Sequence, residues 1–386
     1  VSSVAVIESY SKTLEKVRLS GGGRCNVTHA CWELSHLVTN YPRGQLPLMS
    51  PFSRFATGDA VSWFEERGLK LVAEKDGRMF PVSNSSSDVV SCLRNAAKIC
   101  GVHCLTQQPI NRVEYVKNKR FIVSGKGYKP LEAKKVLLAT GAHPSGRKLA
   151  HALGHSIVDP VPSLFSLQID SFSLNICTGL ALDDVKITLI VGDKSFHEIG
   201  RVLITHLGLS GPAVLRLSAF AARELSKARY KARLSINWID NNLDWTRDHL
   251  NEFRYKESRK RIVNSSPFLK FPKRFWFELL RQADINPNVR WSELSSKSEK
   301  KLLKILLSSS YIVSGKGPYG DEFVTAGGID LREINMSTME SRLVSGLYFA
   351  GELMDVDGIT GGFNFQHCWS SGWLAGKSIA STLNFS

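Results

Sequence analysis

The chain has 386 residues, 43% of them hydrophobic and 22% charged, and its 50 basic and 35 acidic side chains give a formal net charge of +15. This composition is ordinary for a globular protein, and the length predicts two or three domains. No apolar run approaches the roughly 20 residues of a membrane helix, and no signal-peptide pattern is present, so we expect no membrane partner and no secretion.

The seven cysteines are an odd number without zinc-ligand spacing, which indicates a reducing compartment. We therefore expect an intracellular protein, in the cytoplasm or in an organelle such as the plastid. Cys100 and Cys104 frame His103 in a way that could suggest a metal site. Cys92 precedes them on an amphipathic pattern, which favours buried structural thiols. The sequence predicts no metal centre.

The first part of the chain alternates strand and helix patterns, as α/β domains do. Residues 4–8 form a short apolar strand that ends in Glu8. In a dinucleotide-binding fold the second strand ends in a carboxylate that binds the adenosine ribose, about 20 residues beyond a Gly-x-Gly-x-x-Gly turn. No such turn precedes Glu8. Glu8 is therefore either an ordinary strand-end acid or the ribose-binding acid of a fold whose first strand and glycine turn are not included.

A glycine triplet follows, within the run Leu-Ser-Gly-Gly-Gly-Arg-Cys-Asn-Val-Thr at residues 19–28. Gly21, Gly22 and Gly23 allow the backbone to approach a ligand and leave amides free for anionic oxygens. Arg24 adds a charge suited to pyrophosphate. Cys25 is either redox-active or packed, and packing is favoured because no second cysteine has redox-motif spacing to it.

Further along, we expect a helix at 60–66 with Asp59 as its N-cap, hairpins at 69–81 and 112–123, a helix at 87–99 and a strand at 102–105. A buried strand then ends in a small-residue turn at Gly141, which suits close passage beneath a nucleotide.

The pattern changes near residue 160. Strand patterns at 167–169, 185–191, 195–205 and 232–239 predict a β-rich insert. Within it, residues 205–212 form a turn into a helix at 213–225 that begins with Pro212. His206 in this turn is either an acid–base group that faces a substrate or a structural histidine. Residues 244–308 are mostly helical, and the α/β domain resumes near Tyr311.

Residues 241–310 hold 15 basic and 8 acidic side chains, with basic clusters at 259–261, 270–274 and 297–304. Such clusters either attract phosphate-rich partners or form solvated helix faces. The interspersed acids favour solvated faces.

The last 41 residues contain a strand that stops at Gly351 and Glu352, followed by a glycine turn that opens a helix. A carboxylate at a strand end and the free N–H groups of a helix amino terminus can hold a polyol and an electron-rich carbonyl together. A flavin has both. The alternative is an ordinary strand–loop–helix, but five polar residues crowd this turn: Asp355, Asp357, Thr360, Asn364 and Gln366.

These segments together (20–28, 138–141, 205–212, 325–328 and 346–366) resemble the bacterial HI0933-like, or YhiN-like, flavoproteins, which have plant relatives. The resemblance implies a discontinuous Rossmann-like, glutathione-reductase-like FAD domain at 1–158 and 311–386. It also implies an inserted β-rich domain at 159–243 and a small helical domain at 244–310. Family members begin with a strand and a Gly-x-Gly-x-x-Gly turn, and the sequence departs from the family there.

The resemblance also assigns residues to a bound FAD. Glu8 binds the adenosine ribose, Gly141 passes near the cofactor, and Gly351 and Glu352 reach the pyrophosphate and ribityl chain. The pyrophosphate and flavin are lined by Gly21, Gly22, Gly23, Arg24, Cys25 and Asn26. The isoalloxazine lies along Gly361, Gly362, Phe363 and Asn364.

We therefore expect an FAD-dependent oxidoreductase that exchanges hydride with a small-molecule substrate, with His206 as the proton-transfer candidate and NAD(P)H as a possible donor. One alternative is a degenerate flavoprotein fold that acts as a scaffold without FAD. The third and least favoured hypothesis is a nucleic-acid binder that uses residues 254–304.

Overall fold

The computed structural model describes residues 3–116, 119–317 and 324–383. The contacts divide the chain into two compact units, one of Val1–Pro160 with Val324–Ser386 and one of Val161–Phe323. Among the described helices, none is long and apolar enough to cross a membrane.

The first unit contains two sets of parallel strands, as expected for an α/β domain. Strand β1 (Ala5–Ile7) pairs in parallel with β5 (His103–Leu105). Strand β9 (Val136–Leu138) pairs in parallel with β20 (Leu347–Phe349), and the sheet continues through β19 (Glu340–Ser341) and β18 (Ile334–Asn335). The buried strand at the start of the C-terminal stretch is thus confirmed, with all three residues of β20 buried.

Smaller sheets complete this unit. They are β2–β4–β3 (Thr28–His29, Arg78–Pro81, Leu71–Ala73), β6–β7–β8 (Ile110–Val116, Arg120–Gly125, Leu131–Ala133) and β10–β17 (Ile157–Ser163, Val324–Ile329). Both predicted hairpins are confirmed as antiparallel pairs. Residues 117 and 118, in the predicted turn between β6 and β7, lie outside the described residues.

The helices of the first unit are α1 (Glu15–Gly23), α2 (Leu34–Val38), α3 (Met49–Phe52), α4 (Thr57–Glu65), α5 (Ser86–Ile99), α6 (Pro144–Ala152) and α12 (Phe363–Leu383), with short 3-10 turns η4 (Leu331–Glu333) and η5 (Gly351–Leu353). Asp59 was expected to cap α4, but the helix begins two residues earlier. Asp59 instead lies in its first turn, where its carboxylate accepts the Ala56 N–H at 2.8 Å.

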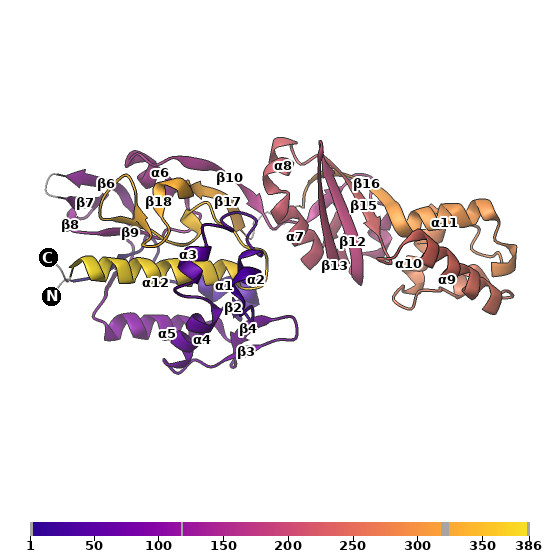
Figure 1. The fold of residues 1–386 in the computed structure, drawn as a ribbon, viewed down its shortest axis with the longest axis horizontal. Coiled ribbons are helices and arrows are strands. Elements are labelled where there is room, and N and C mark those ends of the chain that lie inside the picture. Colours follow the sequence, from indigo (N-terminus) through magenta and orange to yellow (C-terminus); the bar gives the residue numbers. More distant parts are fainter. Residues whose placement is uncertain (1–2, 117–118, 318–323, 384–386) are drawn as a thin grey trace. The chain divides into compact units, whose positions relative to one another are not determined.

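Helix α12 is the longest element of this unit and runs along its middle in Figure 1, where it contacts α3, α4, β2 and β20. Its buried residues recur at intervals of three and four, which is the spacing of one helix face: Phe363, Gln366, His367, Ser370, Ser371, Leu374 and Ala375. Most of that face is polar rather than apolar. The helix is therefore placed by hydrogen bonds as well as by packing.

The second unit is built around a closed six-stranded barrel with the order β11–β14–β13–β12–β15–β16. The strands are Leu167–Ile169, Gly208–Ser210, Lys194–Ile204, Ala181–Val191, Ala232–Asn237 and Ser309–Lys316. On β12, Val185, Ile187, Leu189 and Val191 alternate with less buried residues, because side chains of a strand point to opposite faces. The β-rich insert is confirmed.

Helices α7 (Pro212–Phe220), α8 (Ala222–Lys227), α9 (Leu243–Lys256), α10 (Lys273–Gln282) and α11 (Ser296–Ser308) accompany the barrel, with 3-10 turns η1 (Ser173–Cys177), η2 (Ile262–Asn264) and η3 (Trp291–Glu293). The single helix expected at 213–225 is two helices, because Ala221 leaves helical geometry at φ −89°, ψ 4°. Pro212 begins α7 as expected, and Gly211 is its N-cap.

One hydrophobic core extends through the barrel and the helices that follow it. It contains Ile187 and Leu234 from strands together with Leu250, Trp276 and Leu303 from α9, α10 and α11. Strand β16 closes the barrel between β15 and β11, so Tyr311 lies in the second unit and the chain returns to the first unit at Val324. The division into separate β-rich and helical domains stays a prediction.

The alternation on β12 gives a stability prediction for the second unit. Ile187→Ala should lower the free energy of unfolding by about 2–5 kcal/mol, because it deletes a side chain that is 0% exposed. Ile199→Ala, on neighbouring β13 at a residue 48% exposed, should lower it by less than about 1 kcal/mol. Urea unfolding followed by tryptophan fluorescence measures both values. Equal losses would contradict the inward orientation of Ile187.

Candidate functional site

The carboxyl ends of β9 and β20 bring two predicted cofactor residues together. The two strands are parallel, with Phe349 opposite Leu138, so the residues beyond them leave the same edge of the sheet. A Cβ placed on Gly141 would lie 3.8 Å from Glu352 Oε2 and 3.7 Å from Lys16 Nζ. In open α/β sheets, ligands bind outside the carboxyl ends of the strands. Gly141 and Glu352 are therefore where a nucleotide cofactor is expected.

Glu352 is held in place by two donors. Lys16 Nζ donates to Oε2 at 2.7 Å, and the Thr325 N–H donates to Oε1 at 3.3 Å. The Glu352 side chain is 16% exposed, whereas Lys16 is 73% exposed. The carboxylate is thus a fixed acceptor that still reaches solvent. Lys16 was not expected at this site, because a single lysine on a polar helix carries no signal in the sequence.

Gly351 anchors this strand end on α12. Its N–H donates to Ser371 Oγ at 3.0 Å, and its carbonyl accepts from His367 Nε2 at 3.2 Å. Its φ is +69°, and an added Cβ would lie 3.2 Å from Cys368 Sγ. Both the conformation and the close contact favour glycine here. The position of Glu352 is therefore fixed by the helix beneath it.

The glycine-rich segment near the N-terminus lies against the turn that opens α12. The Asn26 amide, oriented to satisfy its neighbours, donates to the Thr28 and Met79 carbonyls and accepts the Gly362 N–H at 3.0 Å. Thr28 Oγ1 donates to Gln366 Oε1 at 2.6 Å. An added Cβ on Gly362 would lie 2.5 Å from the Thr28 carbonyl carbon. Two motifs more than 300 residues apart thus form one surface.

Phe363 lies under an imidazole in this surface. The rings of His29 and Phe363 stack at 4.6 Å with an interplanar angle of 25°, and His29 Nδ1 lies 3.0 Å from the Gly361 carbonyl. Tyr41 Oη donates to the Phe363 carbonyl at 2.7 Å. The Phe363 side chain itself is only 2% exposed. His29 and Tyr41 were not singled out in the sequence, although His29 directly follows the glycine-rich motif.

Several polar groups near the turn are used by the turn itself. Asn364 Oδ1 accepts the Gly358 N–H and its Nδ2 donates to the Gly358 carbonyl, both at 2.8 Å. The Asp357 carboxylate is fully buried and accepts two bonds from the Arg43 guanidinium, one of them from Nε at 2.5 Å. The crowding seen in the sequence therefore shapes the loop, and nothing local in the sequence pointed to Arg43.

The glycine triplet has a left-handed backbone, a conformation that glycine adopts readily. Gly21, Gly22 and Gly23 have φ of +57°, +68° and +85°, and all three are exposed. The Arg24 guanidinium pairs with Glu74 at 2.5 Å and lies 3.9 Å from the centre of the Phe80 ring. Cys25 is fully buried, and burial raises the pKa of its thiol to about 11. A thiolate is therefore disfavoured at Cys25, which favours a packing role over a redox role.

Two further predicted site residues, Glu8 and His206, have the following surroundings. Glu8 follows β1, is half-buried, and accepts the Tyr10 N–H at 3.0 Å and the Ser9 hydroxyl at 3.2 Å. His206 belongs to the second unit, in the exposed turn between β13 and β14, with its Nδ1 3.4 Å from Thr178 Oγ1. Their roles toward the cofactor stay predictions.

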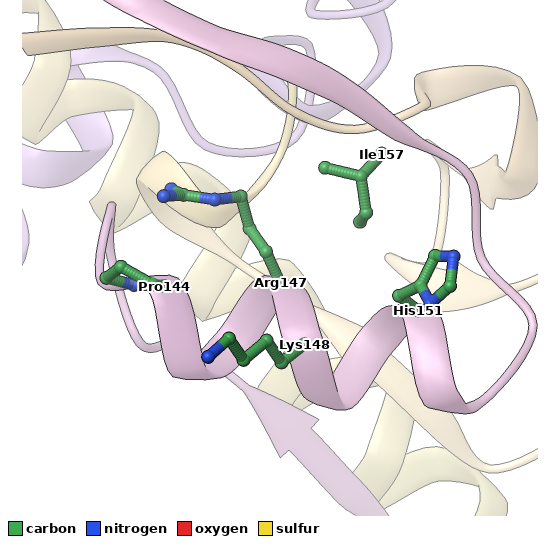
Figure 2. A pocket seen from close by; sticks show the side chains of 5 residues that line it. All are labelled: Pro144, Arg147, Lys148, His151 and Ile157. Atoms are coloured by element: carbon green, nitrogen blue, oxygen red, sulfur yellow. The ribbon is translucent and has the colours of Figure 1, made fainter.

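A shallow hollow of about 350 Å³ lies beside α6, as Figure 2 shows. Pro144, Arg147, Lys148, His151 and Ile157 line it, and Arg147 Nη1 donates to the Ala142 carbonyl at 2.6 Å. None of the predicted site residues lines this hollow. Within the part of the chain that the structure describes, no group of three histidine, cysteine or acidic side chains is arranged to hold a metal ion.

His367 gives the first unit a testable dependence on pH. It is buried on α12, donates through Nε2 to Gly351, and its Nδ1 has no partner among the described residues. Burial lowers the pKa of His367 from 6.5 to about 4. The unfolded chain therefore takes up a proton at a higher pH than the folded one, so the stability is complete above pH 6.5 and is lost as the pH falls toward 4.

We predict that the free energy of unfolding is about 2 kcal/mol lower at pH 5 than at pH 7 because of this residue. His367→Gln should reduce that difference, and His36→Gln, at an exposed position on α2, should preserve it. Urea unfolding of the three proteins at both pH values measures the effect. An unchanged difference in His367→Gln would assign the pH dependence to other groups.

Comparison with known proteins adds the following. The family model described as "HI0933-like protein Rossmann domain" matches residues 1–378. A ribosomal RNA dihydrouridine synthase of Haemophilus influenzae is 29% identical, over 98% of this chain and 92% of that protein. A 3-dehydro-bile acid delta(4,6)-reductase of Clostridium scindens is 27% identical, over 98% of this chain and 93% of that protein.

Among solved structures, a 3-ketosteroid-delta4-(5alpha)-dehydrogenase of Rhodococcus jostii is 12% identical with a TM-score of 0.45, over 96% of this chain and 91% of that one. The family assignment supports FAD as the cofactor and a Rossmann-like fold for the first unit. The family match covers residues 1–378, which include both the glycine-rich segment at 19–28 and the turn before α12. The chain belongs to the HI0933-like family of Rossmann-domain proteins.

Proposed function

We propose that the protein is an FAD-dependent oxidoreductase that transfers a hydride to a carbon–carbon double bond conjugated with a carbonyl group. The observation that carries this proposal is the meeting of Gly141, Glu352 and Lys16 at the carboxyl ends of β9 and β20. That edge is the usual place of a nucleotide cofactor in this kind of sheet.

The residues at this edge fit the cofactor chemically. Gly141 has φ +61° and no side chain, which leaves room for a nucleotide to pass. The fixed Glu352 carboxylate is an acceptor for ribityl hydroxyls, and the first-turn N–H groups of Phe363 and Asn364 suit an anionic ring edge. Glu8 is assigned to the adenosine ribose, and the glycine triplet with Arg24 to the pyrophosphate. When bound and reduced, FAD supplies the hydride.

The names of two relatives support a double bond as the reacting group. Dihydrouridine is uridine with two hydrogens added across a ring double bond, and a delta(4,6)-reductase acts on a pair of double bonds in a bile acid. Saturation of one such bond needs a hydride at one carbon and a proton at the other. A nicotinamide dinucleotide is the proposed source of the two electrons. The substrate is either a small enone or a uracil base in RNA.

His206 is the proposed source of the proton. Its imidazole is exposed and lies within 3.4 Å of one hydroxyl, so it is open to a ligand. Imidazole is the side chain whose ordinary pKa allows it to give and take protons near neutral pH.

The cofactor assignment is tested by Glu352→Gln, which keeps the size of the side chain and removes its charge. We expect the dissociation constant for FAD to rise at least about tenfold, as for the loss of a charge-assisted hydrogen bond. Glu132→Gln, at an exposed position on β8, should bind FAD like the parent protein. Titration followed by flavin fluorescence measures this. A parent protein that takes up no FAD would favour the scaffold alternative.

The proton-transfer role is tested by His206→Ala. We expect the variant to keep its FAD and its melting temperature, because the side chain is exposed, and to lose at least about 100-fold in turnover of an enone substrate. His197→Ala, at a histidine on β13, the strand that precedes the turn of His206, should turn over normally. Full turnover by His206→Ala would remove this residue from the mechanism.

A further inference from the structure

Two arginines lie opposite each other across an antiparallel bridge in the second unit. We call residues 258–262 and 289–292 the basic ribbon. The Ile262 N–H donates to the Val289 carbonyl at 2.9 Å, and the Trp291 N–H donates to the Lys260 carbonyl at 3.1 Å. Arg261 and Arg290 face each other between these bonds. Such a non-hydrogen-bonded pair is the one whose side chains lie closest together.

This pairing is electrostatically unfavourable in the free protein. Both arginines are exposed, and among the described residues neither guanidinium is in an ion pair. The nearby acids are engaged elsewhere: Glu257 pairs with Lys260 at 2.7 Å, and Glu293 accepts the Arg290 backbone N–H at 2.9 Å. Like charges directly opposite each other on paired strands are destabilising. An anion between the two guanidinium groups would remove the repulsion.

The backbone beneath the two arginines is held rigidly. Ile262 and Trp291, their neighbours in the chain, are both 0% exposed. Trp276 Nε1 donates to the Ile262 carbonyl at 2.8 Å, and Trp291 Nε1 donates to Ser265 Oγ at 2.9 Å. Packing of Ile262 and Trp291 in the hydrophobic core therefore holds the two guanidinium-bearing segments side by side. The backbone is already ordered in the free protein, so a ligand does not have to supply the free energy for ordering it.

We propose that Arg261 and Arg290 clamp a backbone phosphate of RNA. Guanidinium groups bind phosphate through pairs of hydrogen bonds. Arg254 on α9 donates to the Ser292 carbonyl at 3.2 Å, which ties the end of α9 to the ribbon, and the next residue, Tyr255, is 87% exposed. An exposed aromatic ring on a helix that is tied to the ribbon offers a stacking surface for an unpaired base.

RNA is favoured over other anions by the chemistry of the relatives and by the charge of the chain. The inference rests on the proposed function, in which a uracil base in RNA is one of the two substrates. The net charge of +15 favours association with a polyanion. The basic ribbon would then position an RNA whose base is reduced elsewhere in the protein.

The test compares two double variants that remove the same charge. One is Arg261→Gln with Arg290→Gln, and the other is Arg201→Gln with Arg247→Gln, whose arginines are exposed on β13 and α9 and paired with the exposed Asp183 and Asp244. The probe is a fluorescein-labelled RNA hairpin with uridines in its loop, and the readout is its anisotropy in the full chain at several salt concentrations. FAD content and unfolding are measured in parallel.

We expect the ribbon variant to bind the hairpin at least about tenfold more weakly and to reduce the slope of log K against log salt by about one, because one phosphate contact is lost. It should keep its FAD and its resistance to unfolding, because a repulsion has been removed. The control variant should lose less than about threefold in affinity.

Equal affinities of the two variants for RNA would overturn the proposal, whatever the FAD content. Binding of phosphatidylglycerol vesicles through the ribbon without binding of the hairpin would overturn it as well. Ribbon-dependent RNA binding by a protein that takes up no FAD would support the ribbon and contradict the proposed function, so the two failures are distinguishable.

Discussion

The first unit depends on the close approach of two backbone segments at Gly362. The Thr28 carbonyl occupies the space that any side chain at Gly362 would need, and Asn26 accepts the Gly362 N–H. This contact positions the amino terminus of α12, and α12 in turn holds the end of β20 through Ser371 and His367. Glycine at position 362 is thus a geometric requirement of the whole site, since any Cβ would force the segments apart.

A buried ion pair gives the first unit conformational specificity. The Arg43–Asp357 pair is almost completely removed from solvent, and breaking a buried pair by removing one partner leaves an uncompensated charge. Replacing both partners by apolar residues can be neutral for stability. The pair therefore selects one conformation of the loop before α12 over its alternatives. The loop has to be unique because it precedes the helix terminus that is proposed to face the flavin.

Much of this architecture could be predicted from the sequence, because strands, turns and glycine motifs leave local signals. The strands around Val6, Val123, Ile187 and Phe349 were all expected from apolar patterning. Contacts between distant residues left no such signal. Lys16 and Arg43 are single cations in polar surroundings, and only the folded chain pairs them with Glu352 and Asp357.

The membership of β16 was missed for a related reason. The apolar pattern of β16 indicates a strand but does not show which strands it pairs with. Its pairing with β11 and β15 assigns β16 to the barrel of the second unit and not to the first unit. The opposed pair Arg261 and Arg290 was likewise invisible in the sequence, where the two residues belong to separate runs. The family resemblance supplied the cofactor, which periodicity and spacing alone left open.

The position of the second unit within the chain has a consequence for folding. Strands β9 and β20 are neighbours in the sheet although about 210 residues separate them, and pairing of such distant segments is slow because a large loop must be closed first. The second unit begins and ends at β10 and β17, which pair with each other. Once the barrel has folded and these two strands have met, the remaining search is that of a much shorter chain. Folding of the inserted second unit therefore brings the two segments of the cofactor domain, which precede and follow it in the chain, close enough to pair.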